Sequence, residues 1–144
     1  MFANLALGSF LIAVTVFIQT VGLIAISTLM PKIIGWFKLH QHVLGKTVAL
    51  VKTVFGLFLV HTVEVWTWAV FYIAIGAIPD FQDALYFSTA TFSTVGGADG
   101  IIDPSWRLLA SLEAVDGFIL IGWSIAYLVA ASTRYGPFRA GEHF

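Results

Sequence analysis

"ALYFSTATFSTVGGADG", residues 84–100, is a short apolar run that leads into a segment with three glycines and one aspartate. The apolar part, residues 84–92, is too short to cross a bilayer, because a spanning helix needs roughly 20 residues. Irregular backbone at membrane depth is tolerated only where protein buries it or water lines it. The stretch therefore predicts a re-entrant helix and a glycine-rich loop beside a water-filled path.

Composition places the whole chain in a membrane. Of its 144 residues, 59% are hydrophobic and 10% are charged, whereas soluble domains average about 45–50% apolar and about 25% charged residues. The net charge of −1 gives no basic surface for nucleic acid. The chain contains no cysteine, which excludes disulfides and thiol chemistry. We expect one all-α integral membrane domain whose partners are the lipid bilayer and copies of itself.

Three long apolar runs flank this stretch and predict transmembrane helices: Leu5–Met30, Thr53–Ala77 and Leu108–Ser132. Each exceeds the roughly 20 residues that span a bilayer core. The first run has no charged residue before Lys32 and is too long for the apolar core of a signal peptide. Pro31 marks its expected end. Between the second and third runs, Asp80 is an expected N-cap, which predicts a short helix over residues 80–92.

The basic residues predict the orientation of these spans. Six of the seven lie between the first two spans or after the third: Lys32, Lys38, Lys46, Lys52, Arg134 and Arg139. Because cytoplasmic loops carry an excess of Lys and Arg, we expect a multi-pass inner-membrane protein with its N-terminus outside and its C-terminus in the cytoplasm. The glycine-rich loop is then external, and four aspartates flank it: Asp80, Asp83, Asp99 and Asp103. An acidic mouth raises the local concentration of cations.

Two further segments complete the expected organisation. Residues 32–52 alternate apolar and basic positions at near-helical spacing, which indicates either an amphipathic helix in the inner interface or a plain topological anchor. Residues 133–144 form a short cytoplasmic tail. Residues 1–31 are then an extra N-terminal transmembrane helix, and residues 53–132 are the unit that carries the glycine-rich loop.

That unit resembles a known family. The opening stretch, followed by "WRLLASLEAVDGFILIG" at residues 106–122, is similar to the pore module of the tetrameric potassium-channel (pore-loop cation channel) superfamily. Together with "HTVEVWTWAVFY" at residues 61–72, it looks like a small bacterial channel. The resemblance implies a four-fold symmetric homotetramer with a pore helix at 80–92, a filter at 93–99 and an inner helix at 106–132. It implies a passive channel for K⁺ or Na⁺, with no cofactor and no enzyme activity.

The resemblance assigns the selectivity filter to seven residues: Ser93, Thr94, Val95, Gly96, Gly97, Ala98 and Asp99. A filter replaces the hydration shell of an ion with rings of backbone carbonyls, which requires exposed backbone. The family pattern is T-V-G-Y-G-D, so this chain has glycine in place of the tyrosine and alanine in place of the second glycine. We expect a wider outer filter and weakened preference for K⁺. Two alternatives are a non-conducting scaffold or accessory subunit, and a filter completed by a different chain.

Polar residues inside the spans are the remaining candidates, because ionisable side chains at that depth are costly and need partners. His61 and Glu64 share one helical face, either as a proton-sensitive or ion-lining pair or as a buried hydrogen-bonded clamp between spans. Asp116 is expected either to offer a carboxylate ring to cations or, like Glu113, to pair with His61 or the pore helix.

Two glycines of the third span are candidates for the gate. Gly117 and Gly122 either hinge an inner gate or allow close helix packing. No metal site is predicted beyond the permeant cations, since His61 has no second histidine at ligand spacing.

Overall fold

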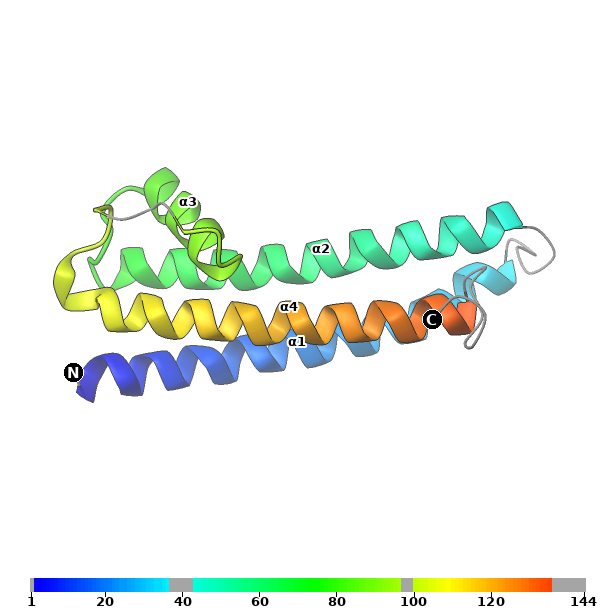
Figure 1. The fold of residues 1–144 in the computed structure, drawn as a ribbon, viewed down its shortest axis with the longest axis horizontal. Helices are drawn as coiled ribbons and strands as arrows, with labels where there is room; N and C mark the ends of the chain where they lie inside the picture. The colour runs from blue at the N-terminus through cyan, green and yellow to red at the C-terminus, as the bar shows by residue number, and fades with distance from the viewer. Residues whose placement is uncertain (1, 37–42, 97–99, 136–144) are drawn as a thin grey trace.

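The structure, a computed structural model, describes residues 2–36, 43–96 and 100–135 and contains only helices and turns in these ranges. The elements are α1 (Phe2–Trp36), α2 (Val43–Ala74), α3 (Phe81–Phe92), the 3₁₀ turn η2 (Pro104–Trp106) and α4 (Arg107–Tyr135) (Figure 1). The predicted all-α class is therefore confirmed.

Three of these helices are long and apolar enough to cross a membrane. The candidate spans are Phe2–Leu29, Gly45–Ala74 and Pro104–Arg134, with mean hydropathies of 2.3, 1.8 and 1.8. They overlap the three predicted runs. Their outward faces carry large exposed apolar side chains, such as Phe17, Phe55 and Phe118. Such faces suit lipid or other copies of the chain rather than water.

The helices α1 and α2 are longer than expected. We expected the first span to end at Pro31 and residues 32–52 to form a separate segment, but α1 continues to Trp36 and α2 already begins at Val43. In the described residues, the two ends of the 32–52 segment therefore continue α1 and α2, and the interfacial location expected for this segment stays a prediction. A proline removes one backbone hydrogen bond, which membrane helices tolerate, and once a helix exists each further residue extends it at low cost.

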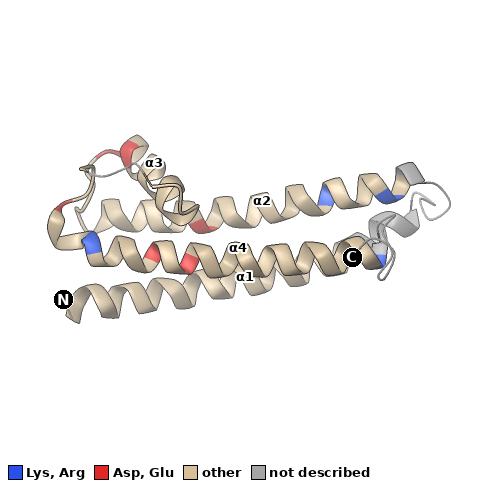
Figure 2. Cartoon of the chain, viewed as in Figure 1, with Lys and Arg blue, Asp and Glu red and all other residues tan. Residues whose placement is uncertain are grey.

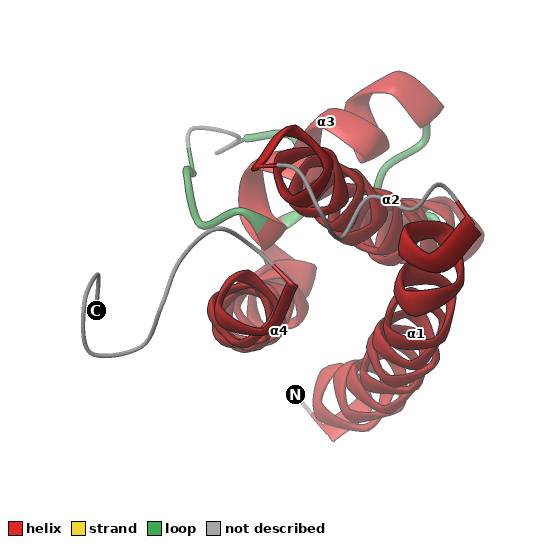
Figure 3. Ribbon diagram, turned by 90° about the vertical axis from the view of Figure 1, so that its right-hand side faces the viewer, coloured by secondary structure: helices red, strands yellow, loops and turns green. Residues whose placement is uncertain are grey.

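The long helices form a three-cornered bundle, and α3 lies on one side of it. Viewed along the bundle, α1 and α3 lie on opposite sides of the α2–α4 pair (Figure 3). The main core joins α2, α3 and α4 through large buried side chains that include Trp68, Tyr72, Phe92 and Leu109. A second core joins α1 to α2 through Leu23, Ile26, Leu57 and Val60.

The chain turns sharply between α2 and α3. Gly76, with φ +69°, donates its amide to the Ile73 carbonyl at 3.0 Å, which ends α2 with the left-handed residue that helix C-termini favour. Asp80 then caps α3, accepting hydrogen bonds from the amides of Gln82 and Asp83 at 2.8 and 3.1 Å. The predicted N-cap is thus confirmed. From this end α3 descends toward the middle of the long helices (Figure 1).

Candidate ion path and its buried polar support

The backbone after α3 folds back onto the end of that helix. The amides of Val95 and Gly96 both donate to the carbonyl of Ala90 at 3.1 Å, and the amide of Thr94 donates to Thr91 at 3.0 Å. This pattern is the Schellman arrangement that closes many helices. The backbone amides of residues 94–96 are therefore all hydrogen-bonded to the end of α3.

The carbonyls of the same residues are left available. Within the described ranges, no hydrogen bond is donated to the carbonyl oxygens of Thr94, Val95 or Gly96, and all three residues are exposed. A segment whose amides are satisfied and whose carbonyls are free presents a row of oxygens, which is the chemistry that cations prefer. The predicted filter residues Gly97, Ala98 and Asp99 lie outside the described residues.

Thr94 adopts an uncommon backbone conformation. Its φ is +59°, and it is the one non-glycine residue with positive φ in the described ranges. The left-handed region costs a side-chain-bearing residue about 1–2 kcal/mol. Gly96, at φ +73°, reaches the same region without that cost. Strain of this kind gathers at functional sites, where the surrounding structure holds it in place.

The end of α3 rests on a glycine of α4. A Cβ built on Gly117 would collide with the backbone carbonyl group and Cα of Phe92. A Cβ built on Gly122 would meet nothing within 4 Å. Of the two predicted roles for these glycines, close packing therefore describes the surroundings of Gly117.

A cavity of about 420 Å³ separates the loop from the first turns of α4. Its lining includes Thr91, Thr94 and Gly96 on the loop side, with Arg107 and Ser111 on the α4 side. Thr94 and Gly96 of the loop thus border a space that can hold several waters.

Glu113 lies behind α3 and pairs with it, which is one of the two pairings expected for this residue. It is fully buried, and its two oxygens accept hydrogen bonds from different helices. The Tyr72 hydroxyl of α2 donates to Oε2 at 2.7 Å, and the Ser88 hydroxyl of α3 donates to Oε1. The Ser88 hydroxyl also lies 2.9 Å from the Val65 carbonyl. Glu113 therefore ties α2, α3 and α4 together beneath the loop.

Asp116 has partners that the sequence interpretation did not foresee. Its Oδ2 accepts a hydrogen bond from Thr15 of α1 at 2.7 Å and one from the Trp68 indole of α2 at 3.2 Å. The residue is 2% exposed and pairs with neither His61 nor α3. The expected pairing with His61 or the pore helix is therefore replaced by bonds to α1 and α2, which supply the donors that a buried carboxylate needs. The alternative, a ring of carboxylates offered to cations, stays a prediction.

His61 and Glu64 form the predicted pair. His61 Nδ1 lies 2.7 Å from Glu64 Oε2, and the His61 ring packs at 5.9 Å from the ring of Phe92. Glu64 is fully buried. Both residues belong to α2, so the hydrogen bond is local to that helix. The His61 ring contacts α3 through Phe92.

Three polar residues of α1 belong to the same support and were missed by the sequence interpretation. Asn4 donates to the Ser105 carbonyl at 2.7 Å, and Gln19 donates to the Leu120 carbonyl and the Ser124 hydroxyl at 3.2 and 2.8 Å. With Thr15, they are the buried polar residues among the α1 side chains that the structure describes. Thr15 and Gln19 are four residues apart and so lie on one face of the helix, and this spacing could have indicated a polar contact with another helix.

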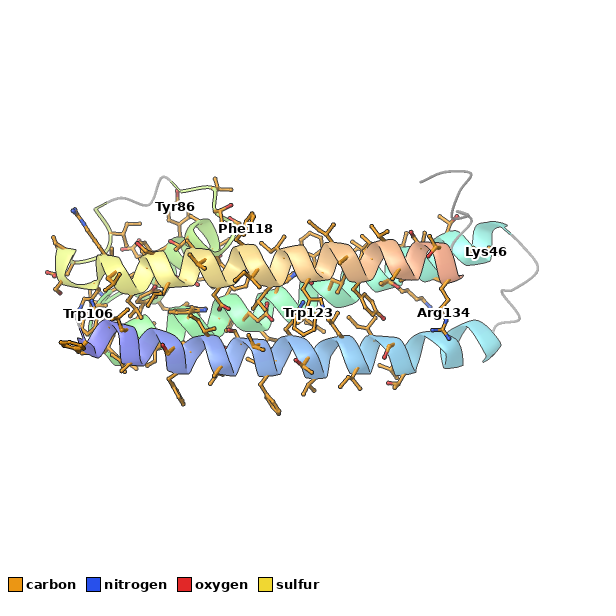
Figure 4. The ribbon with its side chains drawn as sticks, turned by 60° about the horizontal axis from the view of Figure 1, so that its bottom comes forward. Lys46, Tyr86, Trp106, Phe118, Trp123 and Arg134 are labelled. Carbon is orange, nitrogen blue, oxygen red and sulfur yellow. The ribbon has the colours of Figure 1, made fainter. Side chains whose placement is uncertain are left out.

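Acidic and basic residues are unevenly distributed along the molecule, although one basic residue, Arg107, lies at the start of α4 near the acidic end (Figure 2). Acidic residues gather at the end where α3 begins, and Lys46 and Arg134 lie at the other end, opposite Trp106 (Figure 4). At the acidic end, the Ser105 hydroxyl and amide donate to Asp103 at 2.6 and 2.8 Å. The hydroxyl bond, followed by the amide bond, holds the pKa of Asp103 below its usual value. This aspartate therefore keeps its negative charge at pH values where a free aspartate begins to lose it.

No cluster of three metal-binding side chains occurs in the described parts of the chain. A family model described as an ion channel matches residues 58–134, which is more than half of the chain. No curated protein and no solved structure matches the chain. The matched region begins in the middle of α2 and ends with α4, so it contains α3, the loop and all three buried carboxylates.

Proposed function

Because the chain belongs to the ion-channel family, within the pore-loop cation channel superfamily, we propose that it forms a passive pore for monovalent cations. Four copies surround the axis, since one chain supplies only one wall of a filter. In this arrangement α3 is re-entrant and the loop of residues 93–99 lines the narrowest part of the path. K⁺ and Na⁺ are the permeant ions, and transport follows their gradients without a cofactor.

One observation carries the proposal: the free carbonyls of Thr94, Val95 and Gly96 at the inward end of α3. The negative end of a helix dipole favours a cation within its last turn, and the last turn of α3 lies directly before these carbonyls. Support comes from Gly117, which lets the helix end sit close to α4. The helix end that carries the loop is therefore held against α4, while residues 94–96 stay exposed.

The selectivity is proposed to be weak. Gly97 replaces the tyrosine of the family pattern, and Ala98 replaces the second glycine. A glycine supplies no ring to hold the width of the filter, and an alanine resists the left-handed backbone that glycine adopts freely. The outer ion sites are then wider than the inner ones formed by Thr94, Val95 and Gly96.

The orientation is also part of the proposal. The end with Asp80, Asp83 and Asp103 faces outward, where its charges attract cations. The end with Lys46 and Lys52 faces the cytoplasm.

Ion flux from liposomes tests this function. Purified protein, shown to be tetrameric, is reconstituted in vesicles loaded with K⁺ in one series and Na⁺ in another. We expect both ions to leave at comparable rates. Absence of flux for both ions would overturn the proposal and favour the non-conducting scaffold.

Gly96→Ala provides a matched variant, because its added methyl group meets nothing within 4 Å and acts only through the strained φ of +73°. We expect this change to reduce flux, whereas Gly122→Ala, which also meets nothing, leaves the filter unchanged. Equal flux in the wild type and Gly96→Ala would place the ion path elsewhere.

A further inference from the structure

Two buried oxygen atoms in the described part of the chain accept no hydrogen bond: Gln19 Oε1 and Glu64 Oε1. Both side chains are fully buried, and they belong to different helices, α1 and α2. Buried polar atoms in folded proteins are almost always paired. Two unpaired oxygens in one small bundle therefore require an explanation.

The packing of α1 against α2 places both residues at one level. A Cβ on Gly22 would touch Val60, and a Cβ on Gly56 would touch Ile26. The two helices thus run in opposite directions, and each step down α1 corresponds to one step up α2. Gly22 lies opposite Val60. Gln19 is three residues before Gly22, so it lies opposite Val63, three residues after Val60 and next to Glu64.

The packing of α4 leads to the same level independently. Gln19 donates to the Leu120 carbonyl. Trp68 bonds Asp116, and Tyr72 bonds Glu113, so α2 and α4 also run in opposite directions. Trp68 lies opposite Asp116. One helical turn before Trp68 on α2 and one turn after Asp116 on α4, Glu64 lies opposite Leu120. Gln19 and Glu64 therefore lie at the same height, that of Leu120, on neighbouring helices.

The surroundings of Glu64 do not favour a charged carboxylate. His61 is the one partner of Glu64, through Oε2. On α4 the facing ionisable group is Asp116, whose Oδ2 is bonded to Thr15 and Trp68 and which gives Glu64 no hydrogen bond. The α1 helix brings no charged residue before Lys32, and α3 brings only the Phe92 ring against His61. A carboxylate with an unpaired buried oxygen is costly in such a place.

We propose that Glu64 carries a proton on Oε1 and donates it to Gln19 Oε1, so that this level of the bundle is a proton-binding site. One proton then satisfies both unpaired oxygens. His61 donates from Nδ1 to Glu64 Oε2, and Gln19 Nε2 keeps its bonds to Leu120 and Ser124. A continuous hydrogen-bond chain runs from α2 through α1 to α4.

Infrared spectroscopy of the protein in lipid tests the proton directly, because a protonated carboxyl group has its own C=O stretching band. We expect Glu64→Gln to remove one such band at neutral pH. The same band survives in Glu113→Gln and in Asp116→Asn, which are the matched controls. If Glu64→Gln removes no carboxylic-acid band, Glu64 is ionised and the proposal is overturned.

The acceptor is tested by Gln19→Met, which keeps the length of the side chain and removes its carbonyl. We expect the Glu64 band to shift to higher frequency as its O–H loses this acceptor. An unshifted band would show that Gln19 does not receive the hydrogen and would overturn the proposal.

Thermal unfolding in detergent keeps the proposal testable if the spectra are crowded. The amide of Glu64→Gln donates to Gln19 and accepts from His61, so it reproduces every bond of the protonated acid. We expect this variant to unfold at the wild-type temperature and Glu64→Met to unfold at a clearly lower one. Equal lowering in both variants would contradict a protonated Glu64. This result is independent of conduction, since neither measurement involves ion flux.

Discussion

At the scale of single residues, Gly117 sets how closely α3 approaches α4. In Gly117→Ala the new methyl group would occupy the position of the Phe92 carbonyl. Overpacking of this kind costs about 1–3 kcal/mol, and it would push the end of α3 and the following loop outward. We expect a lower free energy of unfolding in detergent and reduced ion flux from liposomes.

Gly122→Ala is the control for this prediction. Its methyl group meets nothing within 4 Å, and alanine favours a helix over glycine by about 1 kcal/mol. We expect unchanged or slightly increased stability. If both alanine variants behave alike, the contact between Gly117 and Phe92 does not hold α3 in place.

Also at this scale, the surroundings of Asp116 show which parts of the polar network could be predicted from the sequence and which could not. The need of a buried carboxylate for partners follows from elementary energetics, so the existence of a polar network was predictable. The partners Thr15 and Trp68 were not identified, because threonine and tryptophan are ordinary residues in a membrane span. Only the packing of three helices selects which of them reaches Asp116.

At the scale of elements, α3 depends on its N-cap. Asp80 accepts two amide hydrogen bonds at the start of the helix, and loss of such a cap costs typically about 1 kcal/mol. We expect Asp80→Ala to accelerate hydrogen exchange of the α3 amides. Gln82→Ala, at an exposed position of the same turn, is the control and should leave exchange unchanged. Equal exchange in both variants would contradict the capping role.

The packing of α1 against α4 is open to a cross-linking test, since the chain has no cysteine of its own. A Cβ on Gly8 would lie 3.4 Å from the Leu112 Cβ, close to the roughly 3.5–4.5 Å that disulfides require. We expect Gly8→Cys with Leu112→Cys to lose both free thiols on oxidation while remaining a single chain. Gly8→Cys with Phe118→Cys, where Phe118 is 71% exposed, should not close a bond within the chain. Closure of the second pair alone would contradict the bundle.

Apolar length and the Asp80 cap predicted all four helices, because both are local signals. The prediction failed at the inner ends of α1 and α2, where Pro31 was read as a stop. A proline removes one backbone hydrogen bond and can bend a helix without ending it, so α1 continues past Pro31 to Trp36.

At the scale of the whole molecule, the proposed pore requires four chains. We expect the purified protein in detergent to have the mass of a tetramer. A monomer in every detergent and lipid tested would contradict the pore, since a single chain encloses no path.

Selectivity is likewise a property of the assembled pore. Gly97→Tyr combined with Ala98→Gly restores the family pattern of the filter. We expect the ratio of K⁺ to Na⁺ flux to rise, because a tyrosine ring in each subunit narrows the outer sites. An unchanged ratio would show that the filter lies elsewhere, and the single change Ala98→Gly is the control for backbone freedom alone.

The bonds between α1 and α4 have a mechanical consequence. Thr15 and Gln19 reach partners in α4, and Asn4 reaches Ser105 in the adjoining turn η2. Each partner is 101 residues further along the chain, so α1 runs parallel to and in step with η2 and α4. The bonded stretch covers about 22 Å of helix at 1.5 Å per residue. Bonds at three heights resist both sliding and rotation, so a bend or twist of α4 has to carry α1 with it. The first helix thus stiffens α4, and the two helices move as one rigid unit.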